Sequence, residues 1–255
     1  MGRVISVANQ KGGVGKTTTA MNLGAALAER QKRTLLIDLD PQAALTSSFG
    51  LQPHTLEQTI YNVLTRPDLP LAATIHSVRP YLSLMPANID LAAAEVELVS
   101  AYGREYVLKE ALKGIRPRYD FLLIDTGPNL GLLTVNALTA SDEVLIPIVC
   151  EFLAMRAINM LMHIIGRVQK RLNPDLRVLG ILGTMYDNHT VHTREMMDEL
   201  RTHFGDKVFD AVITKGIRFA EAPAVHKTIL EYASAHPGSQ AYRNLAEEII
   251  HGKHG

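Results

Sequence analysis

Residues 10–18 read Gln-Lys-Gly-Gly-Val-Gly-Lys-Thr-Thr, and they stand between an apolar run and a run of good helix formers. A loop this rich in glycine presents successive backbone N–H groups to an anion. Lys16 adds a positive charge for the terminal phosphates of a nucleotide, and the Thr17 hydroxyl can ligate Mg²⁺. Residues 3–8 favour a strand and residues 17–28 favour a helix, whose dipole would attract phosphate to the loop. The stretch therefore predicts a P-loop that binds a nucleoside triphosphate through Gly12, Gly13, Val14, Gly15, Lys16, Thr17 and Thr18.

The front end of this loop departs from the general P-loop pattern. That pattern has a glycine six residues before its lysine, where this chain has Gln10. A second lysine, Lys11, opens the glycine-rich stretch instead. The alternative interpretation is a glycine-rich turn that merely opens a helix, and the surrounding strand and helix patterns favour the nucleotide site over it.

Length and composition limit the remaining possibilities. The 255 residues include 26 Lys and Arg and 26 Asp and Glu, so the chain is not coated in basic charge for nucleic acid, although a local patch is possible. The one cysteine, Cys150, excludes a disulfide within the chain and argues against a cysteine-ligated cluster. We interpret it as a buried, inert thiol. The N-terminus carries no leader pattern and no apolar run reaches the roughly 18 residues that span a bilayer, so we expect a cytoplasmic protein.

Strand-like and helical patterns alternate along the whole chain. We predict strands at 3–8, 34–38, 82–85, 121–125, 144–149, 178–185 and 208–213. We predict helices at 17–28, 89–99, 105–115, 130–140, 154–172, 192–204 and 240–250. Nearly continuous apolar strands separated by helices indicate a mostly parallel sheet covered on both faces. The sequence therefore predicts one doubly wound α/β domain over residues 1–255.

Acidic residues follow two of these strands. Asp38 and Asp40 end the second strand, and Asp125, followed by Gly127, ends the strand at 121–125. Ligands of such sheets bind beyond the carboxyl ends of the strands, so these carboxylates should lie beside the P-loop. They could hold the water shell of Mg²⁺ or orient a water for attack on the γ-phosphate. The plainer alternative is that Asp40-Pro41 only starts a turn.

Four segments together resemble the ParA/Soj family of deviant-Walker ATPases, which partition plasmids and chromosomes. They are residues 11–17, the Leu-Ile-Asp-Leu-Asp-Pro-Gln run at 36–42, the segment 131–142 and Arg-Phe-Ala-Glu-Ala-Pro at 218–223. The resemblance covers nearly the whole chain. Because the chain lacks the additional N-terminal helix-turn-helix domain of the longer plasmid proteins, it is similar to the short, Soj-like branch.

The resemblance implies an ATPase with ATP and Mg²⁺ as cofactors and slow hydrolysis. Two ATP-bound monomers would dock face to face as a homodimer, in which the signature lysine, matching Lys11, reaches the partner's nucleotide. A second cation in trans would stabilise the charge that develops on the phosphates. The family pattern implies catalytic roles for Lys11, Lys16 and Asp40, a Mg²⁺ ligand in Thr17, and support of the metal's water shell by Asp38 and Asp125.

The resemblance also implies non-specific DNA binding by the dimer and stimulation by a ParB-like protein. Arg218 matches a DNA-contacting arginine of the family, and Lys215 lies near it. Asn188 and His189 stand where a second such arginine is expected, which would weaken DNA binding and lower its salt slope by about one charge. The protein would then be cytoplasmic and associated with the nucleoid, with no stable membrane association.

Other positions differ from the family pattern or carry weaker signals. Thr214 replaces a usual proline, and Thr126-Gly127 replaces a usual Cys-Pro. Arg167, Lys170 and Arg171 could add DNA contacts, although a solvated helix face is the plainer interpretation. For the adenine base, the end of the strand at Met185 and the turn at Pro223 are in the right part of the fold. The cargo, whether chromosome, plasmid or protein cluster, is not encoded in these motifs.

Three alternatives share this fold. A MinD-like membrane switch would end in a basic amphipathic helix, but residues 240–250 contain Glu247 and Glu248 and a short tail follows. An enzyme like the nitrogenase iron protein would need two cysteines from each subunit. A ligase-type enzyme acting on a small molecule is the third alternative, and stimulation of ATP turnover by DNA rather than by a metabolite would count against it.

Overall fold

Apolar runs rich in leucine, isoleucine and valine form the strands of a central sheet. The computed structural model describes residues 1–66, 68–151, 154–187 and 190–252. Within them all residues of β2, β5 and β6 are buried, as expected of strands covered on both faces. The strands are β1 (Arg3–Val7), β2 (Thr34–Leu39), β3 (His76–Arg79), β4 (Leu82–Met85), β5 (Phe121–Thr126), β6 (Glu143–Val149), β7 (Arg177–Tyr186) and β8 (Val208–Thr214).

The strand order places the acidic strand ends beside the P-loop. The eight strands are ordered β3-β4-β2-β5-β1-β6-β7-β8. Only the β3–β4 pair is antiparallel, which confirms the predicted doubly wound, mostly parallel sheet. Because β2, β5 and β1 are adjacent and parallel, their carboxyl ends form one continuous edge.

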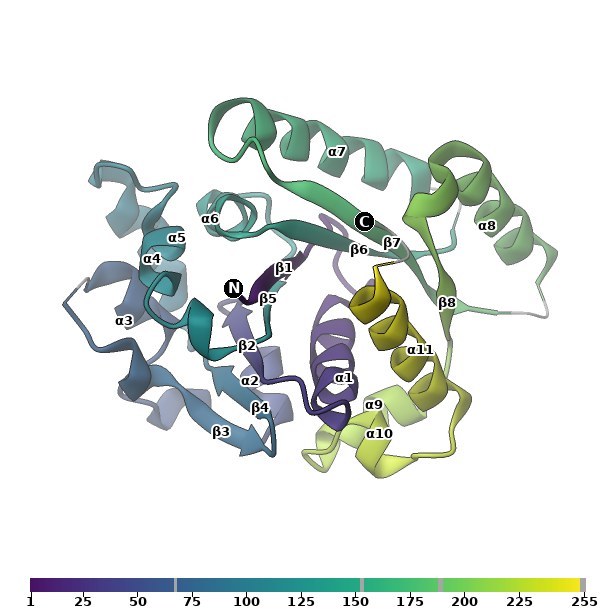
Figure 1. The fold of residues 1–255 in the computed structure, drawn as a ribbon, viewed down its shortest axis with the longest axis horizontal. Coiled ribbons are helices and arrows are strands. Elements are labelled where there is room, and N and C mark those ends of the chain that lie inside the picture. The colour runs from purple at the N-terminus through teal and green to yellow at the C-terminus, as the bar shows by residue number, and fades with distance from the viewer. Residues whose placement is uncertain (67, 152–153, 188–189, 253–255) are drawn as a thin grey trace.

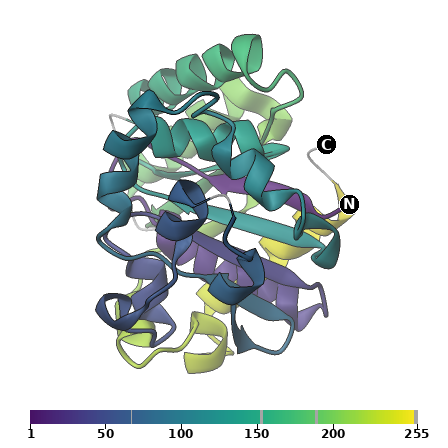
Figure 2. The same ribbon diagram turned by 90° about the vertical axis from the view of Figure 1, so that its left-hand side faces the viewer.

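Helices cover both faces of this sheet. In Figure 1, α6 and α7 lie above the strands and α1 and α11 lie below them, and Figure 2 shows the same layers from the side. Buried side chains of α1 and α11 form one apolar cluster, and those of α3 to α8 form two others. The helices are α1 (Lys16–Glu29), α2 (Ala44–Ser48), α3 (Ile60–Thr65), α4 (Leu91–Glu97), α5 (Val107–Leu112), α6 (Leu132–Ala140), α7 (Ala154–Arg171), α8 (Val191–Phe204), α9 (Arg218–Ala224), α10 (Ile229–Tyr232) and α11 (Pro237–His251).

The sequence missed the short elements and overestimated two helices. The missed elements are β3, α2, α3, α9 and α10, each of seven residues or fewer. Such segments are too short to show a clear hydrophobic period. The predicted helix 89–99 is α4 followed by a 3₁₀ turn at Leu98–Ser100, and the predicted helix 105–115 is reduced to α5.

Within the described ranges, none of the helices combines the length and the apolar character that crossing a membrane requires.

Candidate functional site

The glycine-rich loop connects β1 directly to α1. Gly13 and Gly15 adopt positive φ angles of 72° and 86°, a conformation that favours glycine over other residues. Gly15 is the N-cap of α1, and no acidic side chain occupies the first turn of the helix. The first N–H groups of α1 are therefore available to bind an anion, because no carboxylate in that turn competes for them.

Two contacts hold this loop in place. The Thr184 hydroxyl at the end of β7 donates a hydrogen bond of 2.9 Å to the carbonyl of Val14. The Lys16 ammonium donates one of 3.2 Å to the carbonyl of Lys11. Burial lowers the pKa of Lys16, while the nearby carboxylates of Asp125 and Asp40 act in the opposite direction. The loop thus places a buried lysine between its own backbone and two acids.

Lys11 lies outside this buried cluster. Its side chain is 45% exposed, and its ammonium pairs with Glu151 at 2.5 Å. The Glu151 side chain is itself 57% exposed. An exposed pair of this kind contributes about 1 kcal/mol or less, so Lys11 can leave it at low cost.

Asp38 is held by Thr46 of α2. Its Oδ2 accepts hydrogen bonds from the backbone N–H and the hydroxyl of Thr46, at 2.8 and 2.7 Å. The carboxyl group is fully buried. Burial raises the pKa of Asp38 to about 6, although the hydrogen bonds from Thr46 lower it.

Asp125 lies directly beside Asp38 and is held less closely. The two residues are register partners on β5 and β2. Both carboxyl oxygens of Asp125 are buried and, among the described residues, lack a hydrogen bond of standard geometry. Burial, and then the charge of Asp38, raise the pKa of Asp125 well above its usual value, while Thr17 and Lys16 lower it. An unsatisfied buried carboxylate is costly, which indicates that this one serves a ligand.

Asp40 and Gly127 bring the two strand ends together. A Cβ atom on Gly127 would lie 3.3 Å from Cγ of Asp40, so the loop after β5 packs against the Asp40 carboxylate. Asp40 accepts a hydrogen bond from the N–H of Gln42 at 3.0 Å, so it also starts the turn that the plainer interpretation expected. Thr126 replaces a usual cysteine of the family. Its hydroxyl donates a hydrogen bond of 2.9 Å to the carbonyl of Val7 and so connects β5 to β1.

These oxygen atoms fit a hydrated Mg²⁺ better than a metal held by protein ligands alone. The Thr17 hydroxyl and the two buried carboxylates are the hard donors that Mg²⁺ prefers. In the part of the chain that the structure describes, no three His, Cys, Asp or Glu side chains are grouped for a metal ion. Mg²⁺ usually keeps several waters and binds one or two carboxylates together with substrate phosphates, which agrees with this arrangement.

A cavity of about 330 Å³ lies beside the P-loop, where the loop enters α1. Its position and its apolar walls suit the adenine base of a nucleotide. Met185, which the sequence predicts to contact adenine, lines this cavity. Pro223, the other residue predicted to contact adenine, is not among the residues that line this cavity, whereas Phe219 and Ala220 of the same helix are. Its contact with adenine stays a prediction. The lining residues are Gly15, Thr18, Thr184, Met185, Ile213, Thr214, Lys215, Gly216, Phe219, Ala220 and Tyr242.

The two residues predicted to bind DNA, Lys215 and Arg218, are both exposed near the base cavity. Lys215 is exposed but borders the base cavity. Arg218 pairs with Glu221 at 2.9 Å and lies over the ring of Tyr232, so part of its charge is compensated within α9. Asn188 and His189 lie outside the described residues.

Sequence reasoning missed three residues that shape this site. They are Thr46, which holds Asp38; Glu151, which holds Lys11; and Glu95 of α4, whose Oε1 accepts a hydrogen bond of 3.2 Å from the N–H of Leu133. That bond fixes the start of α6, which follows the loop from Asp125. None of the three belongs to a motif, and each reaches its partner through the tertiary fold.

Comparison with known proteins gives consistent family matches. Residues 2–178 match the family model described as an AAA domain. The chain is 44% identical over 253 residues to the sporulation initiation inhibitor protein Soj of Bacillus subtilis, with 98% of each chain covered. It is 45% identical over 250 residues to the chromosome partitioning protein ParA of Caulobacter vibrioides, covering 97% of this chain and 94% of that one.

A solved structure agrees with the fold and with the site. It is described as cobyrinic acid a,c-diamide synthase of Mycobacterium smegmatis with a bound ATP analog and magnesium. It matches with a TM-score of 0.87 and 39% identity, covering 98% of this chain and 95% of that one.

Proposed function

The chain belongs to the ParA/Soj family of P-loop ATPases, and from that premise we propose that it is an ATP-driven switch for positioning a chromosome, plasmid or other cargo. ATP binding drives a face-to-face homodimer that binds DNA without sequence preference. Slow, Mg²⁺-dependent hydrolysis of ATP to ADP and phosphate resets the dimer, and a ParB-like partner accelerates this step. The protein then works in the cytoplasm, on the nucleoid.

The unsatisfied carboxylate of Asp125 is the observation that carries the ATPase proposal. It is buried beside Asp38 and within electrostatic reach of Lys16, at the point where the P-loop meets α1. A site without a ligand would gain stability by replacing this group, so its presence supports a nucleotide-linked role.

Each site residue then has a chemical role. The N–H groups of residues 12–18 and Lys16 bind the phosphates, and the Thr17 hydroxyl serves as a metal ligand. Asp38 and Asp125 orient the water shell of the ion, and Asp40 places the attacking water. When bound, Mg²⁺ would supply positive charge against the phosphate oxygens.

The exposed position of Lys11 supports the dimer proposal. A lysine that is 45% exposed, with the exposed Glu151 as its partner among the described residues, is available to a facing subunit. Placed near the phosphates of the partner's nucleotide, it would stabilise charge that develops during hydrolysis and make hydrolysis depend on dimerisation.

Retention of non-specific duplex DNA by the purified protein tests this function. We expect retention with ATP, but not with ADP or without nucleotide, at about 50 mM salt and much less at about 200 mM. Lys16→Ala, which removes the phosphate-binding lysine, should abolish retention. Arg218→Ala should keep ATP binding and lower the salt slope by about one. No DNA affinity in the ATP state at low salt would contradict the proposal.

A second candidate is ATP-dependent amide formation on a small carboxylic acid. The observation that favours it is the close structural match to the protein described as cobyrinic acid a,c-diamide synthase. In that reaction ammonia replaces the hydroxyl of a carboxylic acid while ATP yields ADP and phosphate. ATP turnover in the presence of cobyrinic acid and ammonia, compared with turnover in the presence of duplex DNA, separates the two candidates.

A further inference from the structure

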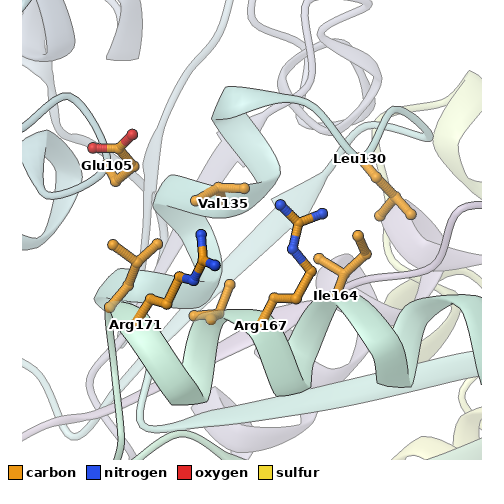
Figure 3. Close-up of a pocket in the computed structure, with 8 residues that line it drawn as sticks. Glu105, Leu130, Val135, Ile164, Arg167 and Arg171 are labelled. Atoms are coloured by element: carbon orange, nitrogen blue, oxygen red, sulfur yellow. The ribbon is translucent and has the colours of Figure 1, made fainter.

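A cleft between α6 and α7 lies apart from the nucleotide site. Its cavity volume is about 460 Å³. In Figure 3, Arg167 and Arg171 extend from α7 toward Val135 of α6, while Glu105 and Leu130 lie at opposite ends of the cleft. The cleft therefore combines an apolar wall with two cationic side chains.

Within the described ranges, the two arginines of the cleft are unpaired. Arg167 and Arg171 are exposed, and among the described residues neither guanidinium has a hydrogen bond or an ion pair. They are four residues apart on one helix face, so their Cβ atoms are separated by about 6 Å. The helix dipole accounts for a cation in the last turn of α7, where Arg171 lies, but not for Arg167 one turn earlier.

The apolar lining of the cleft, which comes from both sides, is partly exposed. Leu130, Val135 and Ile164 line the cleft and are each half-buried. Glu105 closes one end, and its charge is compensated by Arg104 at 3.0 Å, which lowers the pKa of Glu105. The net character of the cleft is thus apolar and cationic.

We propose that this cleft binds an acidic, amphipathic segment of a protein partner. Apolar side chains of the segment pack against Leu130 and Val135, and two of its carboxylates meet Arg167 and Arg171. A phosphate backbone would satisfy the arginines but would leave the apolar wall exposed, whereas an acidic helix covers both. Binding at this surface requires neither ATP nor DNA and goes beyond the function proposed above.

The cleft also contacts the loop that leaves the nucleotide site. Leu130 lies in the segment between Asp125 and α6, whose start is held by Glu95. A segment packed on Leu130 would therefore influence the position of this loop. This coupling to hydrolysis rests on the proposed ATPase function, whereas the binding itself does not.

Fluorescence anisotropy with a designed peptide tests the binding. The probe is a labelled 15-residue helical peptide, with two glutamates and two leucines on one face. We expect it to bind the nucleotide-free protein, to bind more weakly as salt rises, and to lose affinity when its glutamates are replaced by lysine or its leucines by alanine. Arg167→Glu and Arg171→Glu should each weaken binding at least tenfold.

Lys170→Glu is the matched control, because Lys170 is exposed on the same helix but does not line the cleft. It should leave the affinity within about twofold, as expected of an exposed charge outside the contact. A double variant, Arg167→Glu with Arg171→Glu, should bind the lysine version of the peptide, which would show that the variant is folded and that charge at these positions selects the partner.

Three results would overturn the proposal. The first is no binding of the acidic peptide to the unmodified protein, and the second is equal binding by the arginine variants and Lys170→Glu. The third is a loss of DNA retention in both arginine variants but not in Lys170→Glu, with DNA displacing the peptide, because the arginines would then serve nucleic acid. Since the peptide assay contains no nucleotide, its failure is distinct from failure of the ATP-dependent switch.

Discussion

Asp38 and Asp125 are register partners on adjacent parallel strands, and both of their carboxyl groups are fully buried. Thr46 satisfies Asp38, whereas both oxygens of Asp125 lack a hydrogen-bond partner of standard geometry within the described chain. Two carboxylates this close repel each other when both are ionised. The nucleotide-free protein therefore carries an electrostatic cost at the position where we propose that Mg²⁺ and ATP bind.

We predict that Asp125→Asn stabilises the nucleotide-free protein at pH 8 and abolishes Mg²⁺-dependent ATP hydrolysis. The neutral amide removes the buried charge, and it can still accept a hydrogen bond from the Thr17 hydroxyl. The measurement is Tm by thermal unfolding in metal-free buffer, together with phosphate release. A Tm at pH 8 that equals or falls below that of the unmodified protein would contradict the stability prediction.

The same pair predicts how stability depends on pH. The pKa of Asp38 is raised to about 6, and that of Asp125 is raised well above its usual value by burial and then by the charge of Asp38. A carboxyl group whose pKa is higher in the folded than in the unfolded state stabilises the protein fully below the unfolded value of about 4, and this stabilisation is lost as pH rises through the folded value. The advantage of Asp125→Asn should therefore shrink between pH 8 and pH 5. A Tm difference that stays constant over this range would contradict the assignment.

Substitution of Lys16 should impair ATP binding, whereas substitution of Lys11 should impair only ATP hydrolysis. Lys16 is buried in the loop, so Lys16→Ala should weaken ATP binding at least tenfold. Lys11 is exposed and acts, in our proposal, on the partner's nucleotide, so Lys11→Ala should keep ATP affinity and lose hydrolysis. Equilibrium binding of a fluorescent ATP analogue and phosphate release give the two readouts. Equal loss of ATP affinity in both variants would exclude a separate role for Lys11.

Two glycines should respond oppositely to alanine. A Cβ on Gly180 of β7 would lie 2.5 Å from Cε2 of the fully buried Phe209 ring, so Gly180→Ala should cost about 1–3 kcal/mol of unfolding free energy. Gly166 lies in α7 with no atom within 4 Å of the same position, so Gly166→Ala should stabilise by about 0.5–1 kcal/mol. Urea unfolding measures both. If Gly180→Ala proved neutral, the packing of β7 on Phe209 would have to be looser than described.

Cys150 should be unreactive in the folded protein. It is 4% exposed, and burial raises the pKa of its thiol to about 11. At pH 8 only roughly one thiol in a thousand is ionised, and the thiolate is the form that attacks a disulfide reagent. We expect slow modification of the native protein by dithiobis(nitrobenzoate) and rapid, stoichiometric modification in guanidinium. Rapid labelling of the native state would show that the thiol is accessible.

Most of the fold could be predicted because long, apolar segments carry a strong periodic signal. The strand at Leu82–Met85 was predicted with its observed bounds, and the fold class was correct. The edge strand β3 was missed, since it is short, half-exposed and interrupted by a register shift against β4. Met185 and Pro223 were assigned to the base site from their places in the chain, and of the two Met185 lines the cavity beside the loop.

The sequence by itself determined the glycine-rich loop, because the chemistry of a P-loop lies in consecutive residues between a strand and a helix. It also indicated Asp38, Asp40 and Asp125, since acids at the ends of parallel strands meet at one edge. Only the tertiary structure decided that Thr46 satisfies Asp38 while, among the described residues, Asp125 lacks a hydrogen bond of standard geometry, and that Glu95 fixes the start of α6. The arginine-lined cleft likewise exists only where α6 and α7 pack together. Such contacts join residues distant in the chain, and their geometry depends on strand order and helix packing, which no local pattern encodes.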